Sequence, residues 1–127
     1  MPGPVTGVDF ICISTKDLTA AREWYENVLG LTRSKLWRDS DPMGAEFETG
    51  SLTIALLDSQ KLGIEPRPNN HPVALQVDDV EAARAELESR GIEFNVDTID
   101  SGVCHMAYFK DPEGNALMLH HRYAPPE

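Results

Sequence analysis

A segment of about sixty residues occurs twice in this chain, and such a repeat constrains the fold more than any single residue does. The stretch FICISTKDLTAAREWYENVLGL begins at Phe10 and aligns with PVALQVDDVEAARAELESRGI, which begins at Pro72. The offset is 62 positions through the first half of the repeat, and Phe47 and Phe109 keep it. Each of these phenylalanines is followed by a turn and an apolar strand, so the two halves are predicted to fold alike.

Length and composition predict one domain built from these two halves. The chain has 127 residues, of which 41% are hydrophobic, enough for a core without metal or disulfide support, although each half alone would be marginal. Two cysteines, Cys12 and Cys104, are too few for a disulfide framework and fit a reducing compartment. The N-terminus MPGPVTGV is unlike an export signal, and no stretch approaches the roughly eighteen apolar residues of a membrane span. The expected location is the cytoplasm.

The charge balance narrows the expected partners. The net charge is −10, with only 11 Lys and Arg, so phosphate backbones and anionic lipids are repelled and neither nucleic acid nor a membrane is an expected partner. A cationic small molecule would be favoured by long-range steering.

Local patterns predict the same order of elements in both halves. In the first half, Asp17 has the chemistry of a helix N-cap, apolar residues recur at helical spacing after it, and Gly30 is the expected stop. Asp79 and Gly91 have these roles in the second half. The strands are expected over 8–15, 33–38, 43–49 and 52–58, and then over 72–77, 92–97, 103–110 and 115–121. The tail RYAPPE contains prolines and is expected to fray.

The predicted fold class is α+β, with two βαβββ modules that form curved mixed sheets around a cleft and carry their helices on the outer face. The single domain, 1–127, is divided into a first module at about 7–58, a connection at 59–71, a second module at about 72–121 and a tail at 122–127.

Three motifs resemble one known superfamily. They are DLTAAREWYENVLGL at 17–31, VDDVEAARAELESRGI at 77–92 and FKDPEGNALML at 109–119, and with the strands between them they cover nearly the whole chain. Their order and duplication are similar to the vicinal oxygen chelate superfamily of glyoxalases, bleomycin-resistance proteins and extradiol dioxygenases. The resemblance implies a homodimer, but no single activity, because this fold hosts lyases, isomerases, dioxygenases, thiol transferases and drug-binding proteins.

The resemblance also implies where a metal would be held. Metal-dependent relatives place a histidine at the start of the first strand of a module and a glutamate, or an equivalent ligand, in its last strand. Divalent transition-metal ions need such imidazole or carboxylate donors at about 2.0–2.2 Å. The equivalent positions here are Phe10, Pro72, Ala55 and Met118. None of these side chains supplies the required donors, so we expect no metal and no other cofactor.

A noncanonical site built from histidines is the alternative. His71 precedes Pro72 by one residue, so strand alternation directs its ring elsewhere unless a bulge intervenes. His120 is expected to share the face of Met118, His121 to point away, and His105 to lie on the helix side or edge of its strand.

Without metal, the cleft is expected to act through shape, apolar surface and a few polar groups. Period-two alternation and the border position expected for Trp37 give the predicted ligand-binding set Phe10, Cys12, Trp37, Ala55, Gln76, Cys104, Met106, Tyr108, Met118 and His120. Glu46 and His120 are the candidate acid–base residues, although Glu46 also fits a solvated rim carboxylate. Trp37 fits either stacking on a planar ligand or packing, and the two cysteines fit packing.

These observations favour a metal-free protein of the bleomycin-resistance type that sequesters a partly hydrophobic or aromatic, possibly cationic, ligand. The alternative is a glyoxalase-like or dioxygenase-like enzyme, a lyase, isomerase or dioxygenase that uses a noncanonical metal site or acid–base chemistry at Glu46 or His120. A structural or regulatory subunit with a vestigial cleft is the third possibility.

Overall fold

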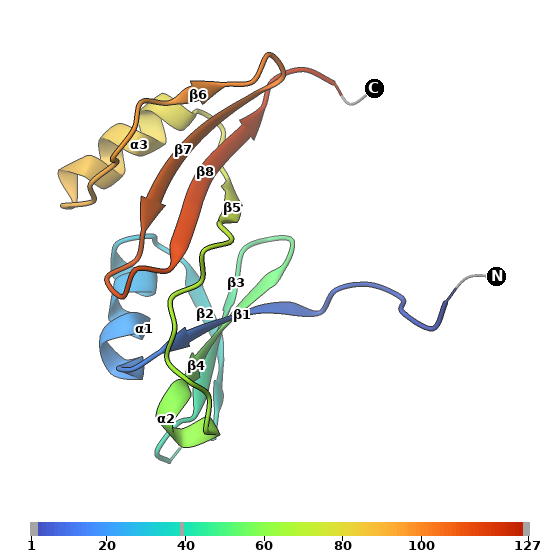
Figure 1. Cartoon of the computed structure of the whole chain (residues 1–127), viewed down its shortest axis with the longest axis vertical. Helices are drawn as coiled ribbons and strands as arrows, with labels where there is room; N and C mark the ends of the chain where they lie inside the picture. Colours follow the sequence, from blue (N-terminus) through green and yellow to red (C-terminus); the bar gives the residue numbers. More distant parts are fainter. Residues whose placement is uncertain (1–2, 39, 126–127) are drawn as a thin grey trace. The chain divides into compact units, whose positions relative to one another are not determined.

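Each half of the chain forms a four-stranded mixed sheet with a helix against one face (Figure 1). The computed structural model describes residues 3–38 and 40–125, which divide after Arg67 into two units. Sheets of this kind joined to helices give the α+β class expected from the sequence, and both units have the βαβββ order. Every helix in the described part of the chain is too short or too polar to cross a lipid bilayer.

The first unit, unit 1, has the strand order β1-β4-β3-β2, with β1 parallel to β4 and the other pairs antiparallel. Its elements are β1 (Phe10–Thr15), α1 (Leu18–Asn27), β2 (Thr32–Trp37), β3 (Gly44–Glu48), β4 (Thr53–Asp58) and α2 (Ser59–Leu62).

The second unit, unit 2, repeats this topology with the order β5-β8-β7-β6. Its elements are β5 (Val73–Gln76), α3 (Val80–Ser89), β6 (Ile99–Asp100), β7 (Cys104–Lys110) and β8 (Ala116–Arg122). The strand β5 is parallel to β8, and the other pairs are antiparallel.

The two main helices begin where the sequence predicts. The carboxylate of Asp17 accepts a hydrogen bond from the Ala20 amide at 3.1 Å, and that of Asp79 accepts one from the Ala82 amide at 3.0 Å. Each carboxylate satisfies a first-turn amide that has no partner within the helix. Gly91 follows the cap of α3 with a positive φ of 92°, a conformation that glycine adopts without steric cost.

The core of each unit lies between its helix and its sheet. In unit 1 the ring of Tyr25 is fully buried and lies 6.1 Å from the ring of Phe47 on β3. In unit 2, Val80 and Leu87 on α3 are buried, as are Phe109 and Leu117 on the sheet. These apolar positions recur at helical spacing on the helices and at alternate positions on the strands, so one stripe of the helix and one face of the sheet are buried together.

Three expectations need correction. Residues 92–97 form no strand, and the ladder at this edge is reduced to β6. The ring of Phe94 packs instead at 5.2 Å from Phe109 and lies under the guanidinium of Arg84 at 4.8 Å, so this segment is held by side chains rather than by a backbone ladder.

The connection at 59–71 contains the short helix α2, which the sequence analysis missed. The carboxylate of Asp58 accepts a hydrogen bond from the Lys61 amide at 3.1 Å, and Gly63 ends the helix with φ 67°. One turn is too short to show apolar periodicity, so only this capping pair signals it.

The described part of the tail does not fray. The amide of Tyr123 donates to the carbonyl oxygen of Val103 at 2.9 Å, and the Tyr123 hydroxyl donates to Asp100 at 2.7 Å. The Tyr123 ring also lies 4.7 Å from the ring of His105. Residues 126–127 lie outside the described residues.

Candidate functional site

The predicted ligand-binding residues of unit 1 lie on the sheet face turned away from α1, which we call the α1-distal face. Strand pairing places Cys12 beside Ala55, Ala55 beside Glu46, and Glu46 beside Lys35. Since side chains at directly opposed positions project on the same side of a sheet, these four form one row across it. Phe10 and Trp37 lie on the same face by alternation along β1 and β2.

Phe10 and Trp37 contact each other across this face, although they belong to the two edge strands. Their ring centroids are 6.0 Å apart with an interplanar angle of 75°. Because β4 and β3 lie between these strands, the two side chains lean toward each other over the middle of the sheet. Ala55, in the middle of this face, has an exposure of 0%, so a ligand reaches it only if neighbouring side chains move.

Glu46 holds the indole of Trp37 in place. The indole Nε1–H donates to Glu46 Oε2 at 2.6 Å. The second oxygen, Oε1, takes part in no hydrogen bond or ion pair within residues 3–38 and 40–125. The α1-distal face therefore presents two aromatic rings beside a half-buried carboxylate with one oxygen available as an acceptor.

Gly44 makes room for the indole, and the sequence analysis did not identify it. A β-carbon at this position would lie 2.8 Å from the Leu56 carbonyl oxygen and 3.0 Å from Trp37 Cε3. The close approach needs glycine, but nothing in the sequence around residue 44 separates such a glycine from an ordinary turn residue.

Cys12 lies exposed on β1 in the same row as Ala55 and Glu46. Partial burial raises the pKa of its thiol above the ordinary value of 9.0, because desolvation disfavours the charged form. At neutral pH the group is a neutral thiol, which suits contact with an apolar ligand better than nucleophilic attack.

The predicted residues of unit 2 lie on the sheet face turned away from α3, the α3-distal face. Pairing aligns Ala74, Met118 and Tyr108 in one row and Gln76, His120 and Met106 in the next. The Tyr108 hydroxyl lies 3.7 Å from Met106 Sδ, a weak hydrogen bond. Cys104 belongs to this face by alternation but is only 7% exposed.

The pairing also supports the equivalence of positions between the two halves. Glu46 pairs with Ala55 as Tyr108 pairs with Met118, and Cys12 pairs with Ala55 as Ala74 pairs with Met118. Ala55 and Met118 therefore occupy equivalent places in β4 and β8, as the repeat predicts.

The side chains present do not fit the divalent metal that the resemblance implies. On the α1-distal face the implied positions are Phe10 and Ala55, and in unit 2 they are Pro72 and Met118, so imidazole and carboxylate donors are lacking. Within residues 3–38 and 40–125, no three His, Cys, Asp or Glu side chains form a group that could hold a metal ion. His105 and His121 pair on the α3 side of the sheet, opposite to His120, so β7 and β8 do not bring the three together.

The match with the Glyoxalase/Bleomycin resistance protein/Dioxygenase superfamily covers residues 7–119. The chain therefore belongs to this superfamily. A comparison with proteins of curated function gave no match.

Solved structures of this fold resemble the chain along most of its length. A glyoxalase/bleomycin resistance protein/dioxygenase from Nocardioides is 26% identical with a TM-score of 0.77, covering 99% of this chain and 91% of that one. TnmS3, an antibiotic-binding protein from Streptomyces sp. CB03234, is 19% identical with a TM-score of 0.78 and coverages of 95% and 99%. Lactoylglutathione lyase from Agrobacterium tumefaciens is 19% identical with a TM-score of 0.75 and coverages of 92% and 94%. At 19% identity the last two likenesses establish the fold alone.

Proposed function

We propose that this protein is a metal-free binding protein of the bleomycin-resistance type, which sequesters a small, partly aromatic molecule on the α1-distal face. The observation that carries the proposal is the Phe10–Trp37 pair beside Glu46. Aromatic rings bind planar ligands by stacking or edge contacts. A surface of this kind needs neither a metal nor a proton transfer to hold its ligand.

The same residues favour a ligand that carries positive charge. The free oxygen of Glu46 accepts a hydrogen bond from an ammonium or amidinium group, and aromatic faces attract cations. The net charge of −10 steers cations toward the protein. A fold neighbour named as an antibiotic-binding protein adds support by analogy.

We propose the α3-distal face separately, as a surface of unit 2 that contacts ligands. Met106, Met118 and Tyr108 offer an adaptable apolar surface with one hydroxyl, and Gln76 and His120 add polar groups at its edge. Thioether side chains adjust to ligands of different shape, which suits sequestration.

Binding of defined probes tests the proposal. In the Trp24→Phe variant, which leaves Trp37 as the sole tryptophan, we expect a planar acridinium dye to change Trp37 fluorescence saturably and to raise the melting temperature. We expect a neutral aromatic of the same ring size to bind more weakly. A Glu46→Gln variant keeps an acceptor for the indole but removes the charge, and its acridinium affinity is expected to fall about tenfold, or about 1.4 kcal/mol.

Glu86→Gln is the matched control, since Glu86 lies on α3 in unit 2 and its carboxylate is exposed. Its affinity should equal that of the parent protein. Absence of acridinium binding, or equal affinity in the Glu46→Gln variant, would contradict the proposal.

The enzymatic alternative rests on the family rather than on the geometry. The superfamily includes enzymes, and one fold neighbour is a lactoylglutathione lyase, at 19% identity. Lyase, isomerase or dioxygenase activity and acid–base roles for Glu46 and His120 stay predictions. Location in the cytoplasm and assembly as a homodimer also stay predictions. Sedimentation velocity tests the homodimer.

A further inference from the structure

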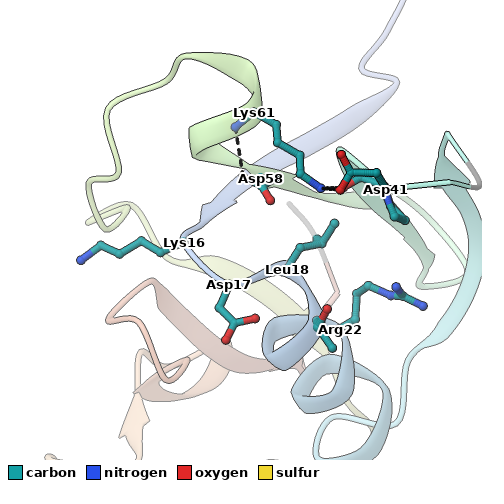
Figure 2. Close-up of a pocket in the computed structure, with 9 residues that line it drawn as sticks. Lys16, Asp17, Leu18, Arg22, Asp41, Asp58 and Lys61 are labelled. Carbon is teal, nitrogen blue, oxygen red and sulfur yellow. Dashed lines mark hydrogen bonds and ion pairs between the residues drawn. The ribbon is translucent and has the colours of Figure 1, made fainter.

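A polar pocket of about 330 Å³ lies in unit 1 beside the start of α1, among residues that do not belong to the α1-distal face. It is formed where β1 and β4 end, together with α2 and the segment before β3. Its lining residues are Lys16, Asp17, Leu18, Thr19, Arg22, Asp41, Pro42, Asp58 and Lys61. Figure 2 shows Leu18 in the middle, Asp41 and Lys61 on one side and Arg22 on the other.

Each of the three carboxylates in this lining already has a partner. Asp17 caps α1 through the Ala20 amide, and Asp58 caps α2 through the Lys61 amide. Asp41 is bound by the ammonium of Lys61, and this hydrogen bond holds the pKa of the Asp41 carboxyl below its usual value. All three carboxylates therefore serve as caps or as one side of an ion pair.

Arg22 is the exception among the charged groups of the pocket. Its Nε is buried and makes no hydrogen bond within the described residues. The rest of its guanidinium also forms no hydrogen bond or ion pair with residues 3–38 and 40–125. A buried donor without an acceptor lowers stability, and a charged one does so more strongly. The carboxylates of the lining do not relieve this, because each is bound by another donor: Asp17 by the Ala20 amide, Asp58 by the Lys61 amide and Asp41 by the Lys61 ammonium.

We propose that this pocket binds the oxyanion of a small molecule, a carboxylate or a phosphate monoester, through the guanidinium of Arg22. The two terminal Nη groups of the planar guanidinium carry N–H donors whose spacing matches two oxygens of either group. Lys61 lies across the pocket from Arg22 (Figure 2), but its ammonium is already paired with Asp41, so Arg22 is the cation that we assign to the ligand. Leu18 and Pro42 offer apolar contact to the rest of the ligand, for which the volume leaves room.

This site is independent of the proposed aromatic-cation site. The two sites share no residue, and their ligands have opposite charge. A negative result for one site therefore does not contradict the other. The overall charge of −10 opposes the approach of an anion and keeps its affinity low, in the millimolar range. Binding is still expected, because salt screens this repulsion over about 8 Å at physiological ionic strength.

Side-chain NMR of the full chain tests the proposal with two probes, inorganic phosphate and acetate, each added against chloride at constant ionic strength. The Arg22 Nε–H resonance, assigned by its loss in Arg22→Gln, is expected to shift saturably with at least one probe. If phosphate alone saturates the shift, the ligand is assigned as a phosphate monoester. If acetate alone does so, the ligand is a carboxylate. If both do so, the site recognises the oxyanion that the two groups share. Each of these three outcomes supports the site.

Two variants separate the site from general anion effects. Arg22→Lys keeps the charge but not the fork, and we expect its amides at Leu18 and Thr19 to report an affinity at least fivefold weaker. Arg33→Gln removes an arginine that is paired with Glu26 outside the pocket and should titrate like the parent protein. The proposal is overturned if Arg22 Nε–H shows no saturable shift with either probe, or if the Leu18 and Thr19 amides titrate equally in the parent protein and Arg22→Lys.

Discussion

At the residue scale, the candidate site depends on small residues that leave room for large aromatic side chains. The indole of Trp37 lies against Gly44, and the fully buried Ala55 occupies the middle of the same face. Gly44 has no chemistry of its own, so no motif signals it, whereas Ala55 was predicted from its equivalence with Met118 in the repeat. The strand alternation that placed Phe10, Cys12 and Glu46 on one face was readable from the sequence, whereas the contact between Phe10 and Trp37 was not, since it joins the two edge strands of the sheet.

Gly44 gives a direct test of this packing. Gly44→Ala would place a β-carbon 2.8 Å from the Leu56 carbonyl oxygen, and we expect a loss of about 1–3 kcal/mol in the free energy of unfolding. Urea denaturation measures it. Gly7→Ala is the control, because a β-carbon there meets nothing within 4 Å. Equal stability of the two variants would contradict the close packing described around Gly44.

The raised pKa of Cys12 predicts slow alkylation at neutral pH. The thiolate is the reactive form, so the rate of reaction with iodoacetamide should keep rising as the pH passes 9.0, the ordinary value. Cys104 is buried and should not react while the protein is folded. Peptide mass spectrometry measures both rates. A rate at Cys12 that levels off below pH 9.0 would contradict the environment described for it.

At the element scale, the helices could be predicted closely and the edges of the sheets could not. Asp17 and Asp79 fixed the starts of α1 and α3, since capping depends on a few adjacent residues. The expected strand at 92–97 failed because Phe94 packs by its ring against Phe109, a contact between positions distant in sequence. Apolar and β-branched residues favour strands in general, but tertiary packing decides whether an edge segment pairs.

The two caps should contribute similar stability. Asp17→Ala and Asp79→Ala each remove one hydrogen bond to a first-turn amide, and each is expected to lower the free energy of unfolding by about 1 kcal/mol. Thermal and urea denaturation measure the losses. Asp97→Ala is a suitable control, because Asp97 caps neither helix. A loss at Asp17 or Asp79 no greater than at Asp97 would contradict the capping role.

The docking of the tail on β6 gives a prediction about pH. The hydrogen bond between Tyr123 and Asp100 is the main cause of both shifts. It lowers the pKa of Asp100 and raises the pKa of Tyr123 above 10.0. The stabilisation from Asp100 is present above its unfolded pKa and is lost as the pH falls through the lowered folded value. That from Tyr123 is present below its unfolded pKa and is lost as the pH rises through the raised folded value.

Ultraviolet titration of the phenolate measures the pH at which Tyr123 ionises. The difference between the parent protein and Tyr123→Phe should show one phenol that ionises above pH 10.0, and Asp100→Asn should move this ionisation back toward 10.0. A Tyr123 phenol that ionises at or below 10.0 in the parent protein would show that the tail is not docked through Asp100.

At the scale of the whole molecule, duplication is what made the fold readable. The equivalence of Ala55 with Met118 and of Glu46 with Tyr108 followed from the repeat, and the strand pairing agrees with it. The same repeat shows how this chain differs from its metal-dependent relatives, because the implied ligand positions of both halves hold hydrocarbon or thioether side chains. The polar pocket around Arg22 could not be predicted, since its lining comes from the residues after β1, from α1, from the segment before β3, from the end of β4 and from α2, which a repeat alignment does not bring together.

We propose that this member of the superfamily binds its ligand without a metal ion. Isothermal titration of the acridinium dye into protein treated with EDTA and dialysed, with residual metal quantified in the same sample, tests it most directly. We predict the same affinity before and after chelation, with metal far below one equivalent, and about tenfold weaker binding in Glu46→Gln. Binding that disappears with chelation and returns with added zinc, iron, nickel or manganese would contradict the claim.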